Sequence, residues 1–174
     1  MSHRALVVIP TEDGWWHGET TWQDGRTKPI DGWRPPRKPP SAADSLRDVV
    51  ESLDFARFDG MYRRAGGEWT AFVMCWLAVE HYLGKPVPEP CGDGAVVAIY
   101  SPRDGPALRT WLRGAKATVA DAVRTNGLSI AAGRRRLLAG LRHRAGNREL
   151  VVGDPPGCDR DTRRFCDRPG YQNP

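Results

Sequence analysis

Residues 105–148 read GPALRTWLRGAKATVADAVRTNGLSIAAGRRRLLAGLRHRAGNR, and this stretch decides the predicted fold. Pro106 stands where a helix can begin, because the first helical residue needs no partner for its N–H. Leu108, Trp111 and Leu112 then recur at the spacing of one helix face. The stretch is therefore predicted to open with an amphipathic helix.

The same stretch contains the signals for two further helices. Thr118 is expected to cap a second helix, since a threonine hydroxyl can accept a hydrogen bond from a free N–H of the first turn. Asn126-Gly127 favours a turn. Ser129 is expected to cap a last helix that runs to about Arg144.

Positive charge is concentrated in this segment. Residues 105–148 have ten basic residues and one acid, a net charge of +9. Residues 1–104 have a net charge of −3 and residues 149–174 of −1, so the overall +5 hides a polarised chain. Such a local excess attracts polyanions, and arginine contacts to phosphate drive binding without sequence preference. A solvated helix surface, a surface docked on the chain's own acids, and an acidic protein partner are the alternatives.

Strands and helices are also predicted before this segment. Residues 4–9 and 15–22 are expected to form two strands around an acidic turn. Residues 24–40 are rich in Gly, Pro and charge and are predicted to be a loop. Residues 41–57, with amphipathic spacing, and residues 69–83, the longest apolar run, are predicted to be helices.

The fold class that follows is α+β, with short, mostly antiparallel strands packed with four or five helices and a basic helical segment in the C-terminal half. Further strands are expected at residues 95–100 and 150–152. The predicted division is an α+β core over 1–104, the basic helical segment over 105–148, and a short strand with an irregular cysteine-containing tail over 149–174. The middle segment is either a separate unit or part of the core domain.

Residues 118–129, TVADAVRTNGLS, resemble the first helix and turn of the helix-turn-helix in lac-repressor-type regulators. In that motif a short helix opens with Thr, carries small apolar residues and ends at a Gly–apolar–Ser turn. The resemblance implies a left-handed Gly127 and a recognition helix capped by Ser129. The residues that it implies nearest to the DNA groove are Ile130, Ala131, Arg134 and Arg135.

Residues 2–22 open with SHRALVV and continue through an acidic turn to aromatic residues. They resemble the start of a haloarchaeal family of unknown function. That resemblance implies no activity.

No catalytic motif and no metal site are expected. The zinc deaminase pattern is incomplete, because the second cysteine that should follow Cys91 is replaced by Gly94. Cys158 and Cys166 lie eight positions apart, which is wider than the spacing of paired cysteines in structural zinc sites. We therefore predict no cofactor and no metal, and a small enzyme of unrecognised type is the third-ranked hypothesis.

The predicted function is that of a non-enzymatic accessory or regulatory protein that binds nucleic acid through a basic helical surface. Its contacts are assigned to Arg134, Arg135, Arg136, Arg142, Arg144, Arg124 and Lys116. The alternative is a structural or protein-interaction module with an acidic protein partner. Without an export signal, and without the ~20 apolar residues that span a bilayer, we expect a cytoplasmic chain with reduced cysteines and no membrane contact.

Overall fold

The computed structural model describes residues 3–23, 26–29, 34, 43–87, 90–125 and 127–153. These residues form a six-stranded mixed sheet in the order β2-β1-β3-β4-β5-β6. The strands are β1 (Arg4–Thr11), β2 (Gly14–Thr21), β3 (Gly60–Ala65), β4 (Glu68–Trp76), β5 (Gly94–Ile99) and β6 (Leu150–Val152). The helices are α1 (Leu46–Glu51), α2 (Asp104–Thr125) and α3 (Ile130–Ala145), with one 3-10 turn, η1 (Glu80–Leu83).

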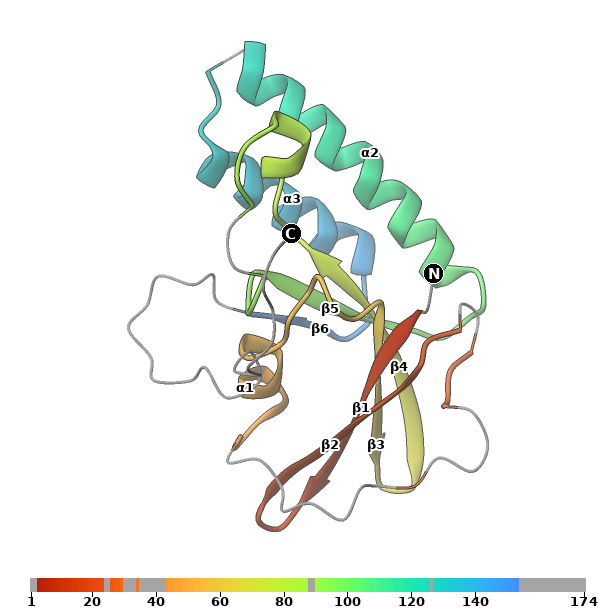
Figure 1. The fold of residues 1–174 in the computed structure, drawn as a ribbon. Coiled ribbons are helices and arrows are strands. Elements are labelled where there is room, and N and C mark those ends of the chain that lie inside the picture. Colours follow the sequence, from red (N-terminus) through yellow and green to blue (C-terminus); the bar gives the residue numbers. More distant parts are fainter. Residues whose placement is uncertain are drawn as a thin grey trace.

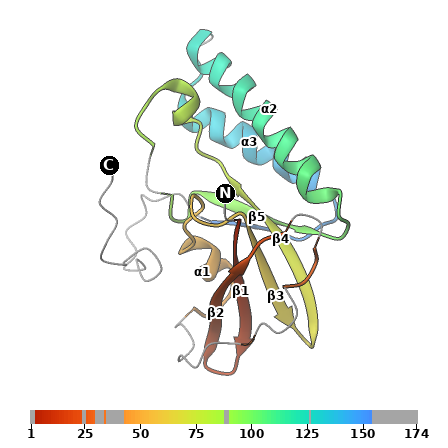
Figure 2. The same cartoon turned by 45° about the vertical axis from the view of Figure 1, so that its right-hand side comes forward.

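Helices cover both faces of this sheet. Helices α2 and α3 lie together on one face, and α1 lies on the other (Figure 1, Figure 2). Successive side chains of a strand point to opposite faces of the sheet, so alternate residues belong to two separate cores. Val73 packs in the core under α2 and α3, and Phe72 packs in the core under α1. All six residues of β5 are buried, because this strand is covered on both faces.

The first half of the sheet combines a hairpin with a crossover. Strands β1 and β2 pair antiparallel along their whole length, and β1 pairs parallel with β3. A parallel neighbour needs a crossover connection, and α1 lies in that connection. Ser45 begins α1, since its side chain accepts a hydrogen bond from the Asp48 N–H.

The basic segment belongs to the same sheet domain. Helices α2 and α3 connect β5 to β6, and these two strands pair antiparallel with each other. Leu108, Leu112, Leu137 and Leu141 of the two helices share a core with β1, β3, β4 and β5. Residues 105–148 are therefore a helical layer on the sheet.

The expectation of four or five helices is wrong, since the described residues contain three helices. Residues 69–83, predicted as one helix, form most of β4 and the turn η1. Their apolar run lacks the strand alternation because β4 is buried on both faces, and such a run cannot be told from a buried helix by its period.

Two further helix predictions are wrong in where the helices begin and end. The predicted second cap, Thr118, lies inside the continuous helix α2, and its hydroxyl donates to the Gly114 carbonyl instead of capping a new helix. The helix predicted over residues 41–57 is reduced to α1, which Ser45 caps. Strand β3 was not predicted at all.

Two observations concern the cysteines and the membrane. Cys75 is a free, buried thiol, whereas Cys91 is disulfide-bonded, which departs from the expectation of reduced cysteines. Cys158 and Cys166, like most of the predicted loop 24–40, lie outside the described residues. Among the helices that the structure describes, none has the length and apolarity to cross a membrane.

Candidate functional site

Helices α2 and α3 form an antiparallel pair that positions the basic residues. A Cβ on Gly140 would lie 2.9 Å from the Trp111 ring, and one on Gly133 would lie 2.6 Å from Val119, so the helices touch along their length. The turn between them has Gly127 at a φ of 66° and Ser129 accepting from the Ala132 N–H. In Figure 1 the first turns of α2 lie beside the sheet, and the other end of α2 extends past the strands next to η1.

The structure separates the seven basic residues of the predicted site into two groups. Four of them, all on α3, are exposed: Arg135, Arg136, Arg142 and Arg144. The other three have partners or are buried. Arg124 donates to Asp121 at 2.6 Å and to the Tyr82 carbonyl. Arg134 and Lys116 point into the molecule.

Arg134 holds two buried carboxylates together. Its guanidinium lies 2.8 Å from the Glu80 carboxylate and 3.1 Å from that of Asp93, whose residues are 8% and 3% exposed. Glu80 also accepts from the Val79 N–H, and Asp93 accepts from the Trp76 indole N–H at 3.3 Å. Burial raises the pKa of the Asp93 carboxyl, and the charge of Arg134 opposes that rise.

Two residues that the helix-turn-helix resemblance places at a DNA groove have other surroundings in the fold. Arg134 is in this internal ion pair, and Ile130 is packed partly buried against the sheet core. We therefore assign neither side chain a contact with nucleic acid.

Lys116 is a buried cation of a different kind. It is 7% exposed, and its ammonium lies 5.7 Å from the centre of the Trp76 ring. Within the described residues it forms no hydrogen bond and no ion pair. Burial lowers the pKa of Lys116 to about 8, although Cys75, Asp93 and Glu80 partly counteract the effect.

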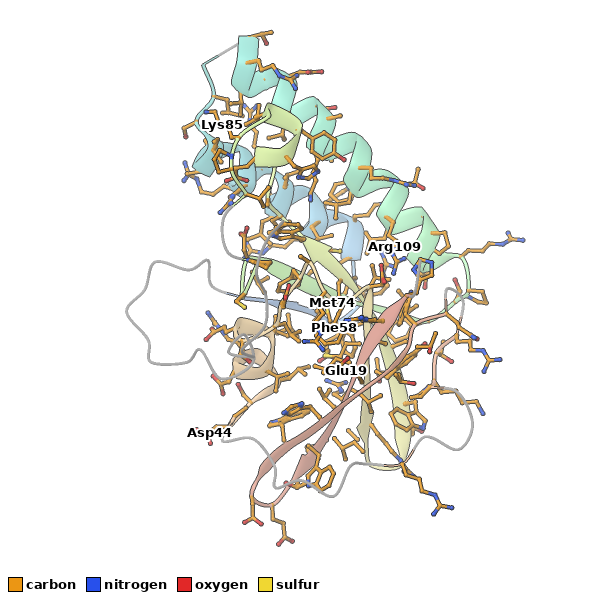
Figure 3. All side chains as sticks on the ribbon, in the orientation of Figure 1. Glu19, Asp44, Phe58, Met74, Lys85 and Arg109 are labelled. Atoms are coloured by element: carbon orange, nitrogen blue, oxygen red, sulfur yellow. The ribbon has the colours of Figure 1, made fainter. Side chains whose placement is uncertain are left out.

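Lys116 lines an open pocket of about 430 Å³. The pocket lies where β4 extends past β3: Gly60 pairs with Val73, so Met74 and Trp76 lie beyond the first residue of β3. Loop residues Phe55 and Phe58 form another part of the wall. Figure 3 labels three lining residues, Phe58, Met74 and Arg109, which lie beside one another below the first turns of α2.

The cationic part of the wall comes from one helix. Arg109, Arg113 and Lys116 lie four and three residues apart on α2 and all line the pocket. Arg109 donates to the Asp59 carbonyl at 2.8 Å, and Arg113 contacts the Thr110 hydroxyl at 3.4 Å. The lining therefore combines three cations with aromatic and apolar side chains.

This pocket was not predicted from the sequence, although one signal pointed to it. Lys116 stands in register with Leu108, Leu112 and Val119, the buried stripe of α2, so a cation was to be expected on an apolar face. The aromatic wall could not be found in this way, because Phe55, Phe58 and Trp76 come from distant parts of the chain and only the tertiary fold unites them.

Comparison of the chain with protein-family models, with curated proteins and with solved structures finds no match in any of the three. Function is therefore inferred from the geometry of the chain's own residues.

Proposed function

We propose that this protein binds nucleic acid, without catalysing a reaction, through the exposed arginines of α3. One observation carries the proposal: Arg135, Arg136, Arg142 and Arg144 are exposed on a helix that contains no acidic residue. None of these guanidiniums has an ion pair or a side-chain hydrogen bond within the described residues. Free arginines of this kind suit phosphate groups, which a planar guanidinium can bind with two hydrogen bonds.

Helix geometry determines which of these arginines act together. Arg135 and Arg142 are seven residues apart, so they project within about 20° of each other and lie about 10 Å apart along the axis. Arg136 projects about 100° away from Arg135 and flanks this pair. We assign the main phosphate contacts to Arg135 and Arg142, with Arg136 beside them. Arg144, nine residues after Arg135, projects about 180° away from it and adds only to the overall positive potential.

The surface composition favours nucleic acid over an acidic protein. A stable protein interface has an apolar, often aromatic centre. Within the described part of the chain the exposed large hydrophobic residues are Val87 and Tyr100, and neither lies on α3. A surface of arginine without such a centre suits a polyelectrolyte, whose binding is driven by the release of counterions.

The test is binding to a short duplex of random sequence, followed by fluorescence anisotropy at several salt concentrations. The variant is Arg135→Ala with Arg142→Ala. Its matched control, Arg47→Ala with Arg64→Ala, removes the same charge from α1 and β3. We expect the α3 variant to bind more weakly and to lower the magnitude of the salt slope by about 0.9 for each phosphate that the protein no longer neutralises.

The control should retain the slope of the unmodified protein, because its arginines lie on elements other than α3. An unmodified protein that does not bind the duplex at low salt would overturn the proposal. An equal loss of affinity in both double variants would also overturn it, since net charge alone would then explain the binding. Retention of an acidic protein instead of DNA or RNA would favour the alternative partner.

A further inference from the structure

The pocket beside α2 carries a second inference, independent of the α3 surface. Its lining contains three cations, Arg109, Arg113 and Lys116, and one carboxylate, that of Asp59, so the net lining charge is +2. The Asp59 carboxylate accepts from the Arg4 N–H at 3.2 Å and lies 3.4 Å from the His3 ring. That carboxylate is thus engaged with the N-terminal strand, and an anion in the pocket would meet mainly cations.

Lys116 is the strongest sign of a ligand. Burying a cation without a partner costs free energy, and buried lysines are therefore rare unless they are paired. Lys116 is 7% exposed, lines the pocket, and lacks an ion pair or hydrogen bond in the described part of the chain. Two buried carboxylates, those of Glu80 and Asp93, lie near Lys116, but both are bound by Arg134. The ammonium contacts the Trp76 ring at 5.7 Å but has no anion among the described residues, so it is left to bind an anion that enters the pocket.

The aromatic side chains specify the rest of the ligand. Phe55, Phe58 and Trp76 line the same pocket as the cations. The Trp76 ring is held in place by the hydrogen bond from its indole N–H to Asp93. A planar ring can stack on such side chains, and an apolar wall with a few polar groups is the usual composition of a small-molecule site.

We propose that this pocket binds a phosphate monoester that carries a planar ring, which is the chemistry of a 5′-nucleotide. The doubly negative phosphate matches the +2 lining, with Lys116 and Arg113 as its principal contacts, since Arg109 already donates to the Asp59 carbonyl. The ring lies against Phe58 and Trp76, over Met74. A volume of about 430 Å³ is within the range of sites for small organic ligands, roughly 300–1,000 Å³.

The ligand has two sources, a free nucleotide or the phosphorylated 5′ end of a nucleic-acid strand. Isothermal titration with adenosine 5′-monophosphate tests the first. Titration with a short single strand, with and without its 5′-phosphate, tests the second. A strand that binds more tightly with its 5′-phosphate than without it, and that loses this difference in Lys116→Met, assigns the pocket to strand ends. A strand whose affinity does not depend on its 5′-phosphate assigns the pocket to free nucleotides.

The variants are Lys116→Met, which keeps the length of the side chain, and Arg113→Met at an exposed position, whose folding is not in doubt. Each should weaken binding of the monophosphate by about tenfold or more, the effect of removing a charged hydrogen bond. Arg135→Ala, on the outer side of α3, should leave this affinity unchanged. It thereby separates the pocket from the proposed nucleic-acid surface.

Adenosine and inorganic phosphate complete the experiment. We expect both to bind more weakly than the monophosphate, since each supplies only half of the ligand. The inference is overturned if the monophosphate does not bind, if both Met variants retain its full affinity, or if adenosine or phosphate alone binds as tightly.

Discussion

Helices α2 and α3 each turn one cation toward the interior, and the two cations meet different surroundings. On α3, Arg134 lies between the carboxylates of Glu80 and Asp93. On α2, Lys116 faces a pocket and the ring of Trp76 without an ion pair among the described residues. The first cation neutralises charge that the fold has buried, whereas the second adds a buried charge. We therefore expect removal of the Arg134 charge to destabilise the fold and removal of the Lys116 charge to stabilise it.

The largest effect is expected from Arg134→Met, which keeps most of the side-chain volume and removes the charge. Two carboxylates would be left buried without their cation, and breaking a buried ion pair in this way costs about 3–5 kcal/mol. The free energy of unfolding by urea, measured at pH 7, should fall by this amount. Arg135→Met, one residue further along and exposed, is the control and should change it by less than about 0.5 kcal/mol. Equal stabilities for the two variants would contradict the structural role of Arg134.

The same substitution at Lys116 should act in the opposite direction. Lys116→Met removes a buried charge whose pKa is lowered from 10.5 to about 8, so the variant should be more stable at pH 7 by on the order of 3 kcal/mol. A variant that loses stability here would show that Lys116 has a structural partner. The result would also remove the energetic argument for a ligand.

The pH dependence of this gain has a definite sign. Between about pH 8 and 10.5 the folded protein has released the Lys116 proton while the unfolded chain still binds it, so stability of the unmodified protein rises with pH in this window. The advantage of Lys116→Met should therefore shrink from pH 8 to 10.5. The charged and titratable groups that face Lys116 are Glu80, Asp93, Arg134 and Cys75, and burial raises the pKa of Cys75 to about 12, above this range. Comparing unfolding curves of the two proteins at several pH values cancels the other groups that titrate in this range.

One glycine on each of α2 and α3 tests how closely the two helices pack. Gly133 of α3 touches Val119 of α2, and a Cβ there would lie 2.6 Å from a Val119 methyl. Gly133→Ala should destabilise the fold by about 1–2 kcal/mol, because overpacking outweighs the ~1 kcal/mol gain in helix propensity. Gly114 of α2 has no atom within 4 Å of such a Cβ, so Gly114→Ala should stabilise the fold by up to about 1 kcal/mol. The same sign for both variants, in thermal or urea unfolding, would argue against the close contact between the helices.

The smallest effect on stability is expected on the outer side of α3. Arg135→Ala with Arg142→Ala should change the free energy of unfolding by less than about 0.5 kcal/mol, because both side chains are exposed and unpaired within the described residues. Circular dichroism during urea unfolding is sufficient to measure this. A larger drop would mean that these arginines support the fold, and weaker nucleic-acid binding by this variant could then not be assigned to the missing guanidiniums themselves.

The sequence predicted the parts of the fold that carry a local signal. The strands at the two ends of the sheet were placed within about two residues, since hairpin turns and short β-branched runs mark them, and Ser129 was identified as the cap of α3. Strand β4 was mistaken for a helix because its burial on both faces removes the alternation of polar and apolar residues. The parallel pairing of β1 with β3 has no local signal, because the two strands are joined through a long connection.

The site was predicted only in part for a related reason. A charge count located the basic segment but could not separate inward from outward side chains. Helix periodicity separates them in principle, since Arg134 lies three residues before the buried Leu137. The carboxylates that bind Arg134 come from η1 and from the residue just before β5, and the aromatic wall around Lys116 comes from other segments of the chain. No spacing in the sequence relates these groups to one another.

The pairing of β6 with β5 has a consequence for the order in which the chain can fold during synthesis. Strand β6 is the last described element to leave the ribosome, and until it arrives the outer edge of the buried strand β5 has no partner. Such an open, apolar edge is a template for pairing with other chains. A nascent chain that stalls after α3 would therefore leave the edge of β5, a strand that is buried in the folded protein, open to neighbouring chains. The three residues of β6, Leu150–Val152, cover that edge.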